Sequence, residues 1–505
     1  MNPSLTILEL AVLALGLALL LLDLWTAPER KRFLGYGAAV ALGLVFAYSF
    51  ARFDGSKTLY AFGGSYAMDS MALFFKRFFL VAAIIVLILC VEFSDRIAAG
   101  ISEYYSLVVF ALAGMMFAAS ANDFTMLFVS VELVTVTFYV LTSFQRSRLP
   151  SLEAGIKYLI LGALSTAFTV YGIALAFGTS GTMKFTELAT LQSTLAGNNL
   201  FLAGLLLVVI GLAFKIAAFP VQIWAPDVYQ GAPTPTAAFL SVGSKAAGFV
   251  LLLRLLFSAV PQVTAQWTQL LIVMSAVTIL YGNLCAIPQR NLKRLLGYSS
   301  IAHAGYLLLG VAAMAGNVRN SEAGGSAILY YLTGYLFTVL AAFTVITLVL
   351  RRIEVEDISG IAGLSQRSPL LAATMTLAMV SLAGIPPLAG FFGKFLLFKA
   401  ALEQGAQNHA YYWLVGIALV GVVISIWYYF GIIRAIYWSR DAYDLSPIPI
   451  SLPIRLALYV CIVGMLLLGL FPGPMVDAAT HAVKALKGES ATATARFLDE
   501  THVRH

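Results

Sequence analysis

Charged side chains are scarce in this sequence. Asp, Glu, Lys and Arg together make up 11% of its 505 residues, whereas 60% of the residues are hydrophobic. A soluble domain needs a largely polar surface, so this composition excludes an ordinary soluble enzyme or binding module. The apolar residues occur in long runs that do not alternate with polar ones, which is typical of membrane-spanning α-helices and not of a β-barrel. We therefore predict an all-α protein that crosses a membrane many times.

Cysteines and cofactor-binding motifs are also nearly absent. Zinc and iron–sulfur sites need several thiolates at short spacing, but the three cysteines lie singly in apolar runs, as Cys90, Cys285 and Cys461. No HExxH occurs, no GxGxxG follows a predicted strand, and Gly393-Lys394 lacks the following Ser or Thr of a phosphate-binding loop. We expect the cysteines to pack as small core residues and the chain itself to bind no cofactor or metal.

About fourteen apolar runs are close to the length of about 20 residues that a helix needs to cross the hydrocarbon core. The first seven are predicted at 5–24, 34–50, 71–91, 104–120, 124–144, 154–177 and 200–219. The second seven are predicted at 236–257, 268–287, 295–314, 327–350, 369–400, 411–436 and 453–470. Arg30, Lys31 and Arg32 follow the first run and no basic residue precedes it, which is the reverse of a cleavable signal peptide. We expect that run to be retained as a helix.

Basic residues collect on one side of this predicted topology. They follow odd-numbered spans, as at Arg96, 146–148, 290–294, 351–352 and Arg440, whereas loops after even-numbered spans hold almost none. Cytoplasmic loops are the ones enriched in Lys and Arg. We therefore expect both termini on the non-cytoplasmic side, and we assign the net charge of +7 to membrane topology instead of nucleic-acid binding.

Four ionisable residues are predicted deep within the spans: Glu132, Lys215, Lys245 and Lys394. Each costs at least about 2.5–3.5 kcal/mol at the bilayer centre, so residues of this kind usually face a water-lined interior on an ion or substrate path. We interpret them as proton-transfer groups, with the charge of Glu132 favouring the protonated form of Lys215. The alternative for Glu132 is a purely structural ion pair with a lysine of another helix.

Two further ionisable residues are secondary candidates. Lys157, near the start of span six, is either an interfacial anchor or a carrier of protons towards Lys215. His303 is either a hydrogen-bonded core residue or a proton carrier, because a neutral imidazole can pass a proton through its two nitrogens. Lys293 and Arg294 fit interfacial anchors better than proton carriers. The acidic residues that we predict to be solvated in loops are Asp227, Glu322, Glu354, Glu356 and Asp357.

Two spans combine an in-membrane lysine with residues that break helices. Span seven has Lys215 followed by prolines at 220, 226, 233 and 235, and span twelve has Gly384, Pro386, Pro387 and Gly390 ahead of Lys394. Paired interruptions in corresponding halves are typical of inverted-repeat transporters. We predict two five-helix repeats, spans four to eight and nine to thirteen, with helices seven and twelve broken. The alternative for the first break is an ordinary loop after Pro220.

Three motifs give the chain a specific resemblance. They are "PDVYQGAPTP" at 226–235, "NLKRLLGYSSIAHAGYLL" at 291–308 and "SLAGIPPLAGFFGKF" at 381–395. Together with the order of the charges, they make the chain similar, over nearly its whole length, to the antiporter-like proton-pumping subunits of respiratory complex I, NADH:quinone oxidoreductase. Within that family it resembles the N type, because the M type typically has Glu where this chain has Lys394. Gln222 departs from the histidine often found there, so no role is carried onto it.

The resemblance implies a role for each candidate residue. Glu132 and Lys215 would form the modulating pair of a first half-channel, Lys245 would pass charge to the centre, and His303 would continue the path to Lys394. The expected segments are 1–103 as an N-terminal three-helix segment, 104–258 and 259–437 as the two repeats, and 438–505 as the last helix and tail. We expect no cofactor in this chain. NADH, FMN, iron–sulfur clusters and quinone would be bound by partner subunits.

The expected partners are other membrane subunits of complex I, including other antiporter-like ones, the peripheral redox arm and the lipid bilayer. The resemblance places the chain in a bacterial inner membrane as a multi-pass subunit. One alternative is a subunit of a multi-component cation/proton antiporter or of a membrane-bound hydrogenase. A second alternative, from another class, is a solitary transporter of an organic solute.

Overall fold

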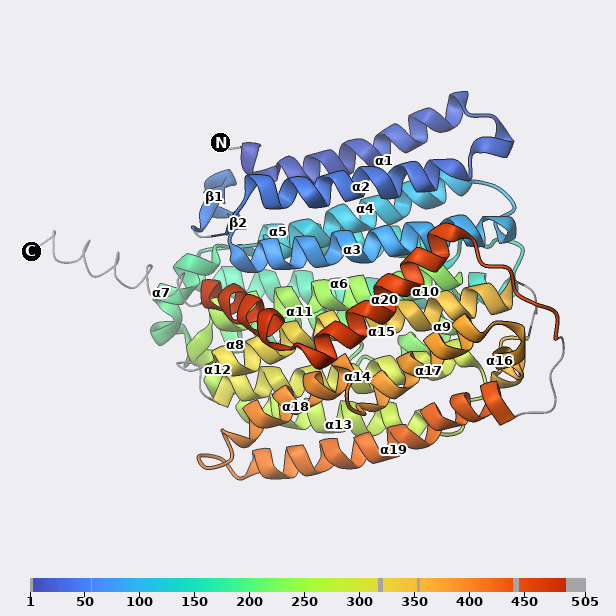
Figure 1. Cartoon of the computed structure of the whole chain (residues 1–505). Coiled ribbons are helices and arrows are strands. Elements are labelled where there is room, and N and C mark those ends of the chain that lie inside the picture. Colours follow the sequence, from blue (N-terminus) through green and yellow to red (C-terminus); the bar gives the residue numbers. More distant parts are fainter. Residues whose placement is uncertain (1–2, 56, 317–320, 352–354, 439–444, 487–505) are drawn as a thin grey trace, which may run out of the picture.

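The computed structural model describes residues 3–55, 57–316, 321–351, 355–438 and 445–486. Its helices lie side by side in one elongated bundle, and most of them run between the same two ends (Figure 1). One end carries the β-hairpin, α7 (Phe185–Leu195) and α12 (Pro261–Gln266), and we call it the hairpin end. The other carries α16 (Leu364–Arg367), and we call it the α16 end.

Three long helices form the N-terminal part of the bundle. They are α1 (Ile7–Trp25), α2 (Phe33–Arg52) and α3 (Ser70–Phe93). Strands β1 (Leu59–Ala61) and β2 (Tyr66–Met68) pair antiparallel between α2 and α3. This hairpin was not predicted, because each strand has three residues and leaves no clear alternating pattern in the sequence.

The first repeat follows. It contains α4 (Ile101–Ala119), α5 (Phe124–Thr142), α6 (Leu149–Ser180), α8 (Asn199–Ile216), α9 (Trp224–Gly231) and a continuous helical run from Thr234 to Ala259. That run consists of α10 (Thr234–Phe239), a π-helical turn at Leu240–Ser244, α11 (Lys245–Leu253) and a second π-helical segment at Arg254–Ala259. π-Turns inside α-helices occur frequently at functional sites.

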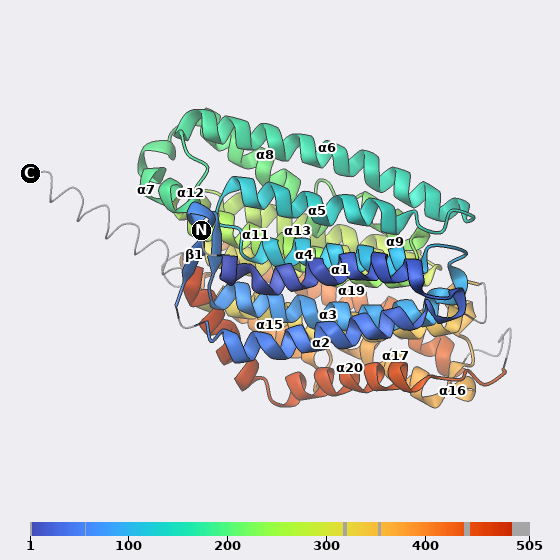
Figure 2. The same ribbon diagram turned by 90° about the horizontal axis from the view of Figure 1, so that it is seen from above.

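The second repeat contains α13 (Thr268–Ala286), α14 (Leu292–Gly316), α15 (Glu322–Leu350), α17 (Pro369–Ala383), α18 (Ala389–Leu402) and α19 (Ala410–Trp438). Helix α20 (Leu452–Leu470) and helical residues 473–486 complete the described chain. Helix α4 starts at the α16 end, whereas α13 starts at the hairpin end beside α12 (Figures 1 and 2). The five-span unit is therefore repeated with inverted orientation.

Both predicted breaks are present. In span seven, α8 ends at Ile216 and is followed by Ala217 in the left-handed conformation, and α9 starts at Trp224 after a turn that contains the cis Phe219-Pro220 bond. In span twelve, α17 ends at Ala383 and is followed by Gly384 with φ +82°, and α18 starts after the cis Pro386-Pro387 bond. Glycine is needed at 384 because of this positive φ and because a Cβ there would lie 2.8 Å from the side chain of Lys394.

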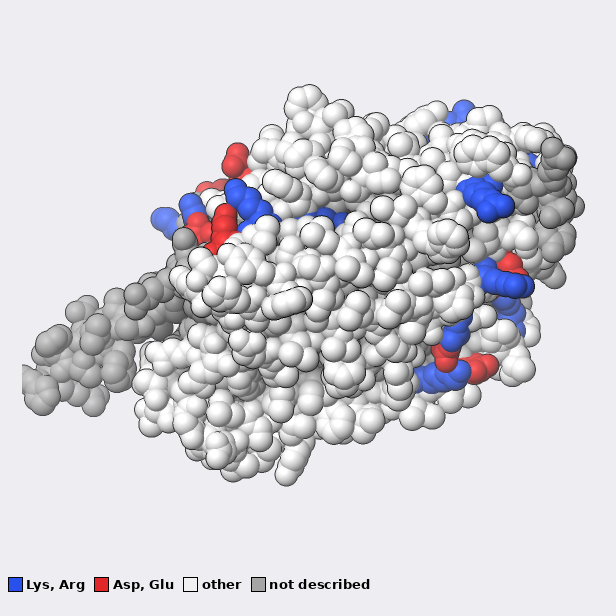
Figure 3. Space-filling view, turned by 90° about the horizontal axis from the view of Figure 1, so that it is seen from below, with Lys and Arg blue, Asp and Glu red and all other residues white. Residues whose placement is uncertain are grey.

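The predicted spans agree with the structure. Among the described residues, thirteen helices are long and apolar enough to cross a membrane, and the predicted span 369–400 is the broken helix α17–α18. The central spans α14 and Thr234–Ala259 are almost wholly buried, whereas α1, α2 and α6 expose apolar faces. Charged side chains gather towards the two ends of the face seen in Figure 3, with a mainly uncharged surface between them. This distribution is that of an integral membrane protein.

Candidate functional site

Lys215 lies where α8 ends, and only 6% of its surface is exposed. Its ammonium group donates a hydrogen bond to the hydroxyl of Thr135 on α5. The C-terminal end of a helix carries partial negative charge, so the position favours a cation. Because the chain turns away directly afterwards, the break places this lysine in the interior and not at a membrane surface.

Glu132 lies one turn before Thr135 on α5. Its carboxylate accepts a hydrogen bond of 2.7 Å from Thr166 of α6. The ion pairs within 4 Å among the described residues do not include one between Glu132 and Lys215. The two groups are thus connected through α5, where Thr135 contacts the lysine, and not by direct contact.

Lys245 follows the π-helical turn at Leu240–Ser244 and is buried in the centre of the bundle. Its ammonium group donates to the backbone carbonyl of Ser300 at 2.5 Å and also to the Ser300 hydroxyl. The ring of Tyr335 on α15 lies 5.1 Å from the same nitrogen. No acidic side chain contributes to these contacts, so neutral dipoles and an aromatic face surround the charge.

Helix α14 provides a polar face that continues from this contact. Ser300, His303 and Tyr306 are three residues apart and therefore share one side of the helix. The imidazole of His303 is hydrogen-bonded on both sides, from Nδ1 to the hydroxyl of Tyr331 at 2.5 Å and from Nε2 to the hydroxyl of Tyr429 at 3.1 Å. Both ring nitrogens therefore have a partner that can exchange a proton.

Lys394 of α18 completes the series. Its ammonium group donates to the carbonyl oxygens of Leu382 at 2.7 Å and Ala383 at 3.1 Å, which are the last residues of α17. These carbonyls are free to accept because the break removes the next helical turn. The ring of Tyr306 lies 5.1 Å from the same nitrogen, so α14 contacts both central lysines.

A small cavity of about 10 Å³ lies beside this series. It is lined by side chains or backbone of α15, of the broken helix and of His303. This is close to the minimum space that one water molecule needs, and the hydroxyls of Tyr331, Thr338 and Ser381 in its lining supply polar partners. The region between His303 and the break is therefore suited to one bridging water.

The α16 end carries ion pairs between the two repeats. Asp227 of α9 accepts from Lys157 of α6 at 2.7 Å and from Arg294 of α14 at 2.5 Å. Glu356 accepts from Arg148 at 2.9 Å and from the buried Lys293 at 3.2 Å. Our interpretation of Asp227 and Glu356 as solvated loop charges was therefore wrong, because each pairs with two basic groups from different parts of the chain.

The other loop acids differ from these two. Glu322 is the first residue of α15, and the backbone of Asp357 forms an isolated antiparallel β-bridge with Asn291. Glu354 lies outside the described residues. Lys293 is also more deeply placed than an interfacial anchor, since only 1% of its side chain is exposed. Sequence position alone gave no indication that the loop carrying Glu356 folds back over α14.

Replacement of Glu356 by glutamine is expected to make the folded chain less stable at neutral pH but not in acid. Burial alone would raise the pKa of Glu356, but Lys293, Arg148 and Asn291 hold that pKa below its usual value of 4.5. The contacts therefore stabilise the fold above pH 4.5 and lose their contribution as the pH falls through the lowered pKa.

The expected loss for Glu356→Gln is about 1–3 kcal/mol, because Lys293 would remain buried without its counter-ion. Thermal unfolding of the purified assembly, followed at several pH values, measures it. Glu403→Gln is a suitable control, since Glu403 is half-exposed and lies 4.0 Å from Lys399. Equal destabilisation by Glu356→Gln at neutral and at acidic pH would contradict this assignment.

The predicted site residues lie in three places. Lys245, His303 and Lys394 are brought together by α14, and Lys215 with Glu132 lies on the neighbouring helices α8 and α5. Lys157 lies apart at the α16 end with a side chain that is 40% exposed. Sequence reasoning missed the hydroxyl partners of the series: Thr135, Ser300, Tyr331 and Tyr429. The sequence signal that could have pointed to these partners is the i, i+3 spacing of Ser300 and His303, which places both on one side of an otherwise apolar helix.

The cysteines lie apart from one another in the fold. Cys90 and Cys461 are buried and Cys285 is half-buried, all as free thiols. Within the described ranges, no group of three or more His, Cys, Asp or Glu side chains has a geometry that could hold a metal ion.

A family model, curated relatives and solved structures all match this chain over more than half of its length. The family model described as "NADH:quinone oxidoreductase/Mrp antiporter, TM" matches residues 121–425. The NADH-quinone oxidoreductase subunit N of Desulforamulus reducens is 40% identical over 484 residues, covering 96% of this chain and 98% of that protein. A chain of the respiratory complex I from Thermus thermophilus with bound aureothin superposes with a TM-score of 0.76 at 32% identity, covering 94% of this chain and 99% of that one. A chain of an archaeal membrane-bound sulfane sulfur reductase has a TM-score of 0.84 at 24% identity, covering 97% and 99%, and shares the fold.

Proposed function

Because the chain belongs to the NADH:quinone oxidoreductase/Mrp antiporter family of membrane subunits, we propose that its buried lysines and His303 carry protons from one end of the bundle towards the other. The chain is a proton-translocating, multi-pass membrane subunit of NADH:quinone oxidoreductase. The steps proposed below use the side chains of this chain together with water molecules that bridge them. The single observation that carries the proposal is the contact of α14 with both Lys245 and Lys394, on either side of His303.

The first step would take place at Lys215. A carboxylate on the neighbouring helix favours the ammonium form of a buried lysine through its charge. Glu132 is held by Thr166 of α6, while Thr135 on the same helix as Glu132 is held by Lys215. A small movement of α5 relative to α6 or α8 would therefore change both contacts together, and with them the ability of Lys215 to keep its proton.

The second step would lead from Lys215 to Lys245. The buried hydroxyl groups of Tyr158 and Ser244 lie between these regions and close to each other, and within the described part of the chain neither has a further hydrogen-bond partner. Tyr158 stacks on Phe214, the neighbour of Lys215, and Ser244 directly precedes Lys245. Both hydroxyls are placed to bind a proton-carrying water.

The third step would pass the proton along α14. Lys245 contacts Ser300, and His303 follows one turn later with both ring nitrogens hydrogen-bonded. A neutral imidazole accepts a proton at one nitrogen and releases one from the other. Lys394 would then receive the proton, since the carbonyl oxygens of Leu382 and Ala383 stabilise its ammonium form.

We further propose the orientation and the functional division of the chain. Residues 104–258 and 259–437 would each supply one half-channel, between the N-terminal segment 1–103 and the last helix with its tail, 438–505. The basic residues at the α16 end support a cytoplasmic location for it, with Lys157 at the entrance and both termini on the opposite side. The homologues are bacterial, which supports the plasma membrane.

The oxidation of NADH by quinone would take place in other subunits of the assembly. Other membrane subunits would cover the exposed apolar helices, including other antiporter-like chains, and the redox arm would bind NADH, FMN, iron–sulfur clusters and quinone. Co-purification tests this arrangement. Recovery of the chain with flavin- and iron–sulfur-containing subunits is expected, whereas recovery with a small set of antiporter subunits alone would contradict it. Transport of an organic solute by the isolated chain in liposomes would favour the solitary transporter instead.

Replacement of Glu132 by glutamine is expected to reduce proton translocation without preventing assembly. Glutamine keeps the shape and the hydrogen bond with Thr166 but removes the negative charge that acts on Lys215. The loss should be partial, because the carboxylate acts on the lysine from beyond 4 Å and does not itself hold the transferred proton.

The measurement is the number of protons translocated per electron by the assembly in sealed vesicles. Glu403→Gln serves as control, since Glu403 is 49% exposed and its ion-pair partner, Lys399, lies outside the proposed path. A value for Glu132→Gln equal to that of the wild type would show that Glu132 is only a structural residue.

A further inference from the structure

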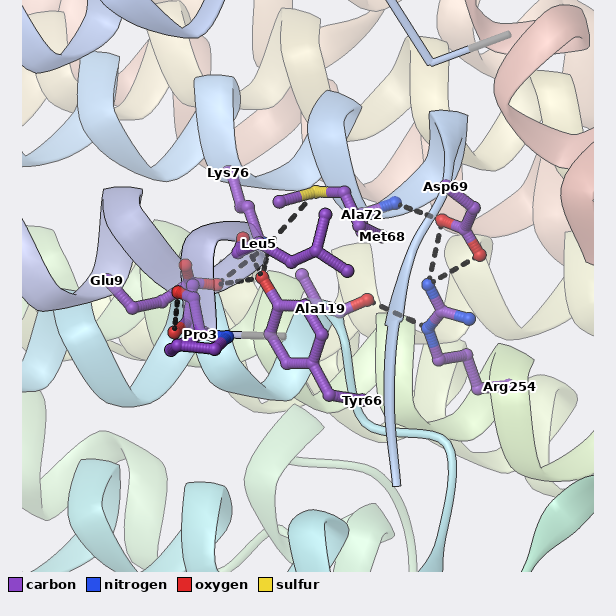
Figure 4. Close-up of polar contacts among 11 residues, drawn as sticks. Pro3, Leu5, Glu9, Tyr66, Met68, Asp69, Ala72, Lys76, Ala119 and Arg254 are labelled. Atoms are coloured by element: carbon purple, nitrogen blue, oxygen red, sulfur yellow. Dashed lines mark hydrogen bonds and ion pairs between the residues drawn. The ribbon is translucent and has the colours of Figure 1, made fainter. Parts of the chain in front are cut away.

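A second group of buried charges lies beside the β-hairpin and includes none of the residues of the row that leads from Lys215 to Lys394. Figure 4 shows its polar contacts. Glu9 of α1 and Lys76 of α3 form an ion pair of 2.7 Å, and both side chains are fully buried. A buried pair of this kind often stabilises a protein no more than apolar residues of the same size would. Its presence within two membrane spans therefore calls for a functional explanation.

Tyr66 of β2 connects the two charged groups. Its hydroxyl lies 2.7 Å from Lys76 Nζ and 3.0 Å from Glu9 Oε1, and it also lies 3.0 Å from the backbone carbonyl of Leu5. Lys76 Nζ contacts Met68 Sδ at 3.3 Å as well. The second carboxylate oxygen, Glu9 Oε2, is buried and accepts no hydrogen bond from any described residue. This oxygen is an unoccupied position for a proton.

A surface cavity of about 440 Å³ lies directly outside this cluster. Its inner wall includes Leu5, Met68 and Leu73, two of which contact Tyr66 or Lys76. Its outer wall includes the exposed residues Arg52, Asp54 and Lys57. Leu5 and Met68 thus contact the cluster on one side and line the surface cavity on the other.

A second buried pair lies on the inner side of the cluster. Asp69 accepts two hydrogen bonds from Arg254 Nη2, at 2.9 and 3.0 Å, and both side chains are 1% exposed. Arg254 also donates to the carbonyl of Ala119 at 2.8 Å, and Asp69 accepts from the amide of Ala72. The charges that interact electrostatically with the Lys76 ammonium group are those of Glu9, Asp69 and Arg254. The titratable hydroxyl of Tyr66 is in direct contact with it.

Arg254 connects this region with the central lysine row. It belongs to the same helical run as Lys245, nine residues further along, which is about 13 Å at helical rise. The run is π-helical directly before Lys245 and again from Arg254 onwards. A change at Lys245 that shifts this helix would therefore move Arg254 relative to Asp69. The electrostatic interaction of both charges with Lys76 would change as a result.

We propose that Glu9, Lys76 and Tyr66 form a second proton-exchange site, through which protons pass to the aqueous phase at the hairpin end. A proton binds at Glu9 Oε2 and forms an O–H bond. An N–H bond of Lys76 then breaks and its proton leaves to water in the cavity. Rotation of the carboxylic acid group about its Cγ–Cδ bond brings the protonated oxygen to the position of Oε1, which lies 2.7 Å from Lys76 Nζ. There the O–H bond breaks, an N–H bond forms on the neutral amine, and the ion pair is restored. One proton enters and one leaves in each cycle, and no other reactant is required.

The proposal rests on the function proposed above, since the central row would supply the protons. It is tested by replacing the pair with apolar residues of similar size, Glu9→Leu with Lys76→Met, in the intact assembly. The exposed pair Lys184 and Glu187 on the same side offers a matched control, Lys184→Met with Glu187→Leu. The readouts are co-purification of the subunit and protons released per electron in sealed vesicles.

The buried-pair variant is expected to assemble and to release fewer protons per electron, while the control keeps the wild-type ratio. An assembled buried-pair variant with the wild-type ratio would overturn the proposal. If Lys215→Ala, measured in parallel, also kept the wild-type ratio, the central row itself would be refuted. If only Lys215→Ala lowered the ratio, the second site alone would be refuted.

Glu9→Gln keeps the inference testable if the double variant fails to assemble. Infrared difference spectra of the intact assembly during turnover are expected to show protonation of a carboxyl group that is missing in Glu9→Gln. Identical spectra for the wild type and for Glu9→Gln would overturn the proposal, because they would show that Glu9 never takes up a proton.

Discussion

In an assembly that carries Lys215→Ala, proton transfer through this chain is expected to stop while the subunit stays in place. Alanine removes the group that holds the proton, whereas the hydroxyl of Thr135 still has neighbours that can accept its hydrogen bond. The helix should still end at Ile216, because the break is encoded by the left-handed residue Ala217 and by Pro220. The measurement is NADH-driven acidification of one side of sealed vesicles, with subunit content determined on the same sample.

The control for this variant is Lys399→Met. Lys399 is 63% exposed and forms only a 4.0 Å contact with Glu403, so its loss should not change proton transfer. If acidification by Lys215→Ala vesicles matched that of the wild type at equal rates of quinone reduction, Lys215 would not be part of the path.

The second large effect is expected for Lys394→Ala. Its ammonium group fills the space between the two halves of the broken helix, where the carbonyl oxygens of Leu382 and Ala383 have lost their helical partners. Alanine removes the two hydrogen bonds that the ammonium group donates to these carbonyls. It also removes the last proton-holding side chain of the row. Complete loss of the contribution of this chain to proton translocation is therefore expected.

Phe395→Ala provides the comparison, because Phe395 is the next residue on α18 and is half-exposed. It changes apolar area on the same helix but no group of the row. The readout is again acidification per electron, together with co-purification. Wild-type acidification by Lys394→Ala would place the end of the path at another residue.

The sequence contained much of this arrangement in a form that simple physical rules can interpret. Lys215 and Lys394 stood out because a charge within an apolar run is costly. The breaks were predictable because Pro220, Gly384 and the Pro386-Pro387 pair interrupt apolar runs that are otherwise continuous. His303 was a candidate proton carrier because an imidazole can pass a proton through its two nitrogens, and in chain order it lies between Lys245 and Lys394.

Contacts between residues distant in the chain were not predictable in this way. Glu9 and Lys76 lie near the starts of their helices, where a charge is usually solvated, but both side chains are buried and share a contact with Tyr66 of β2. Glu356 was interpreted as solvated because it lies in a predicted loop, whereas the structure pairs it with the buried Lys293. Periodicity reports which face of a helix is apolar, but it does not report which loop folds over that face.

The most direct test of the central claim is the number of protons translocated per electron in Lys215→Ala, Lys394→Ala and the combined variant. If the row from Lys215 to Lys394 is one connected path, either single change interrupts it completely. The account therefore predicts the same reduced ratio for all three variants, set by the other pumping subunits. A combined variant whose ratio falls by the sum of two smaller single losses would show independent paths, and it would contradict the account.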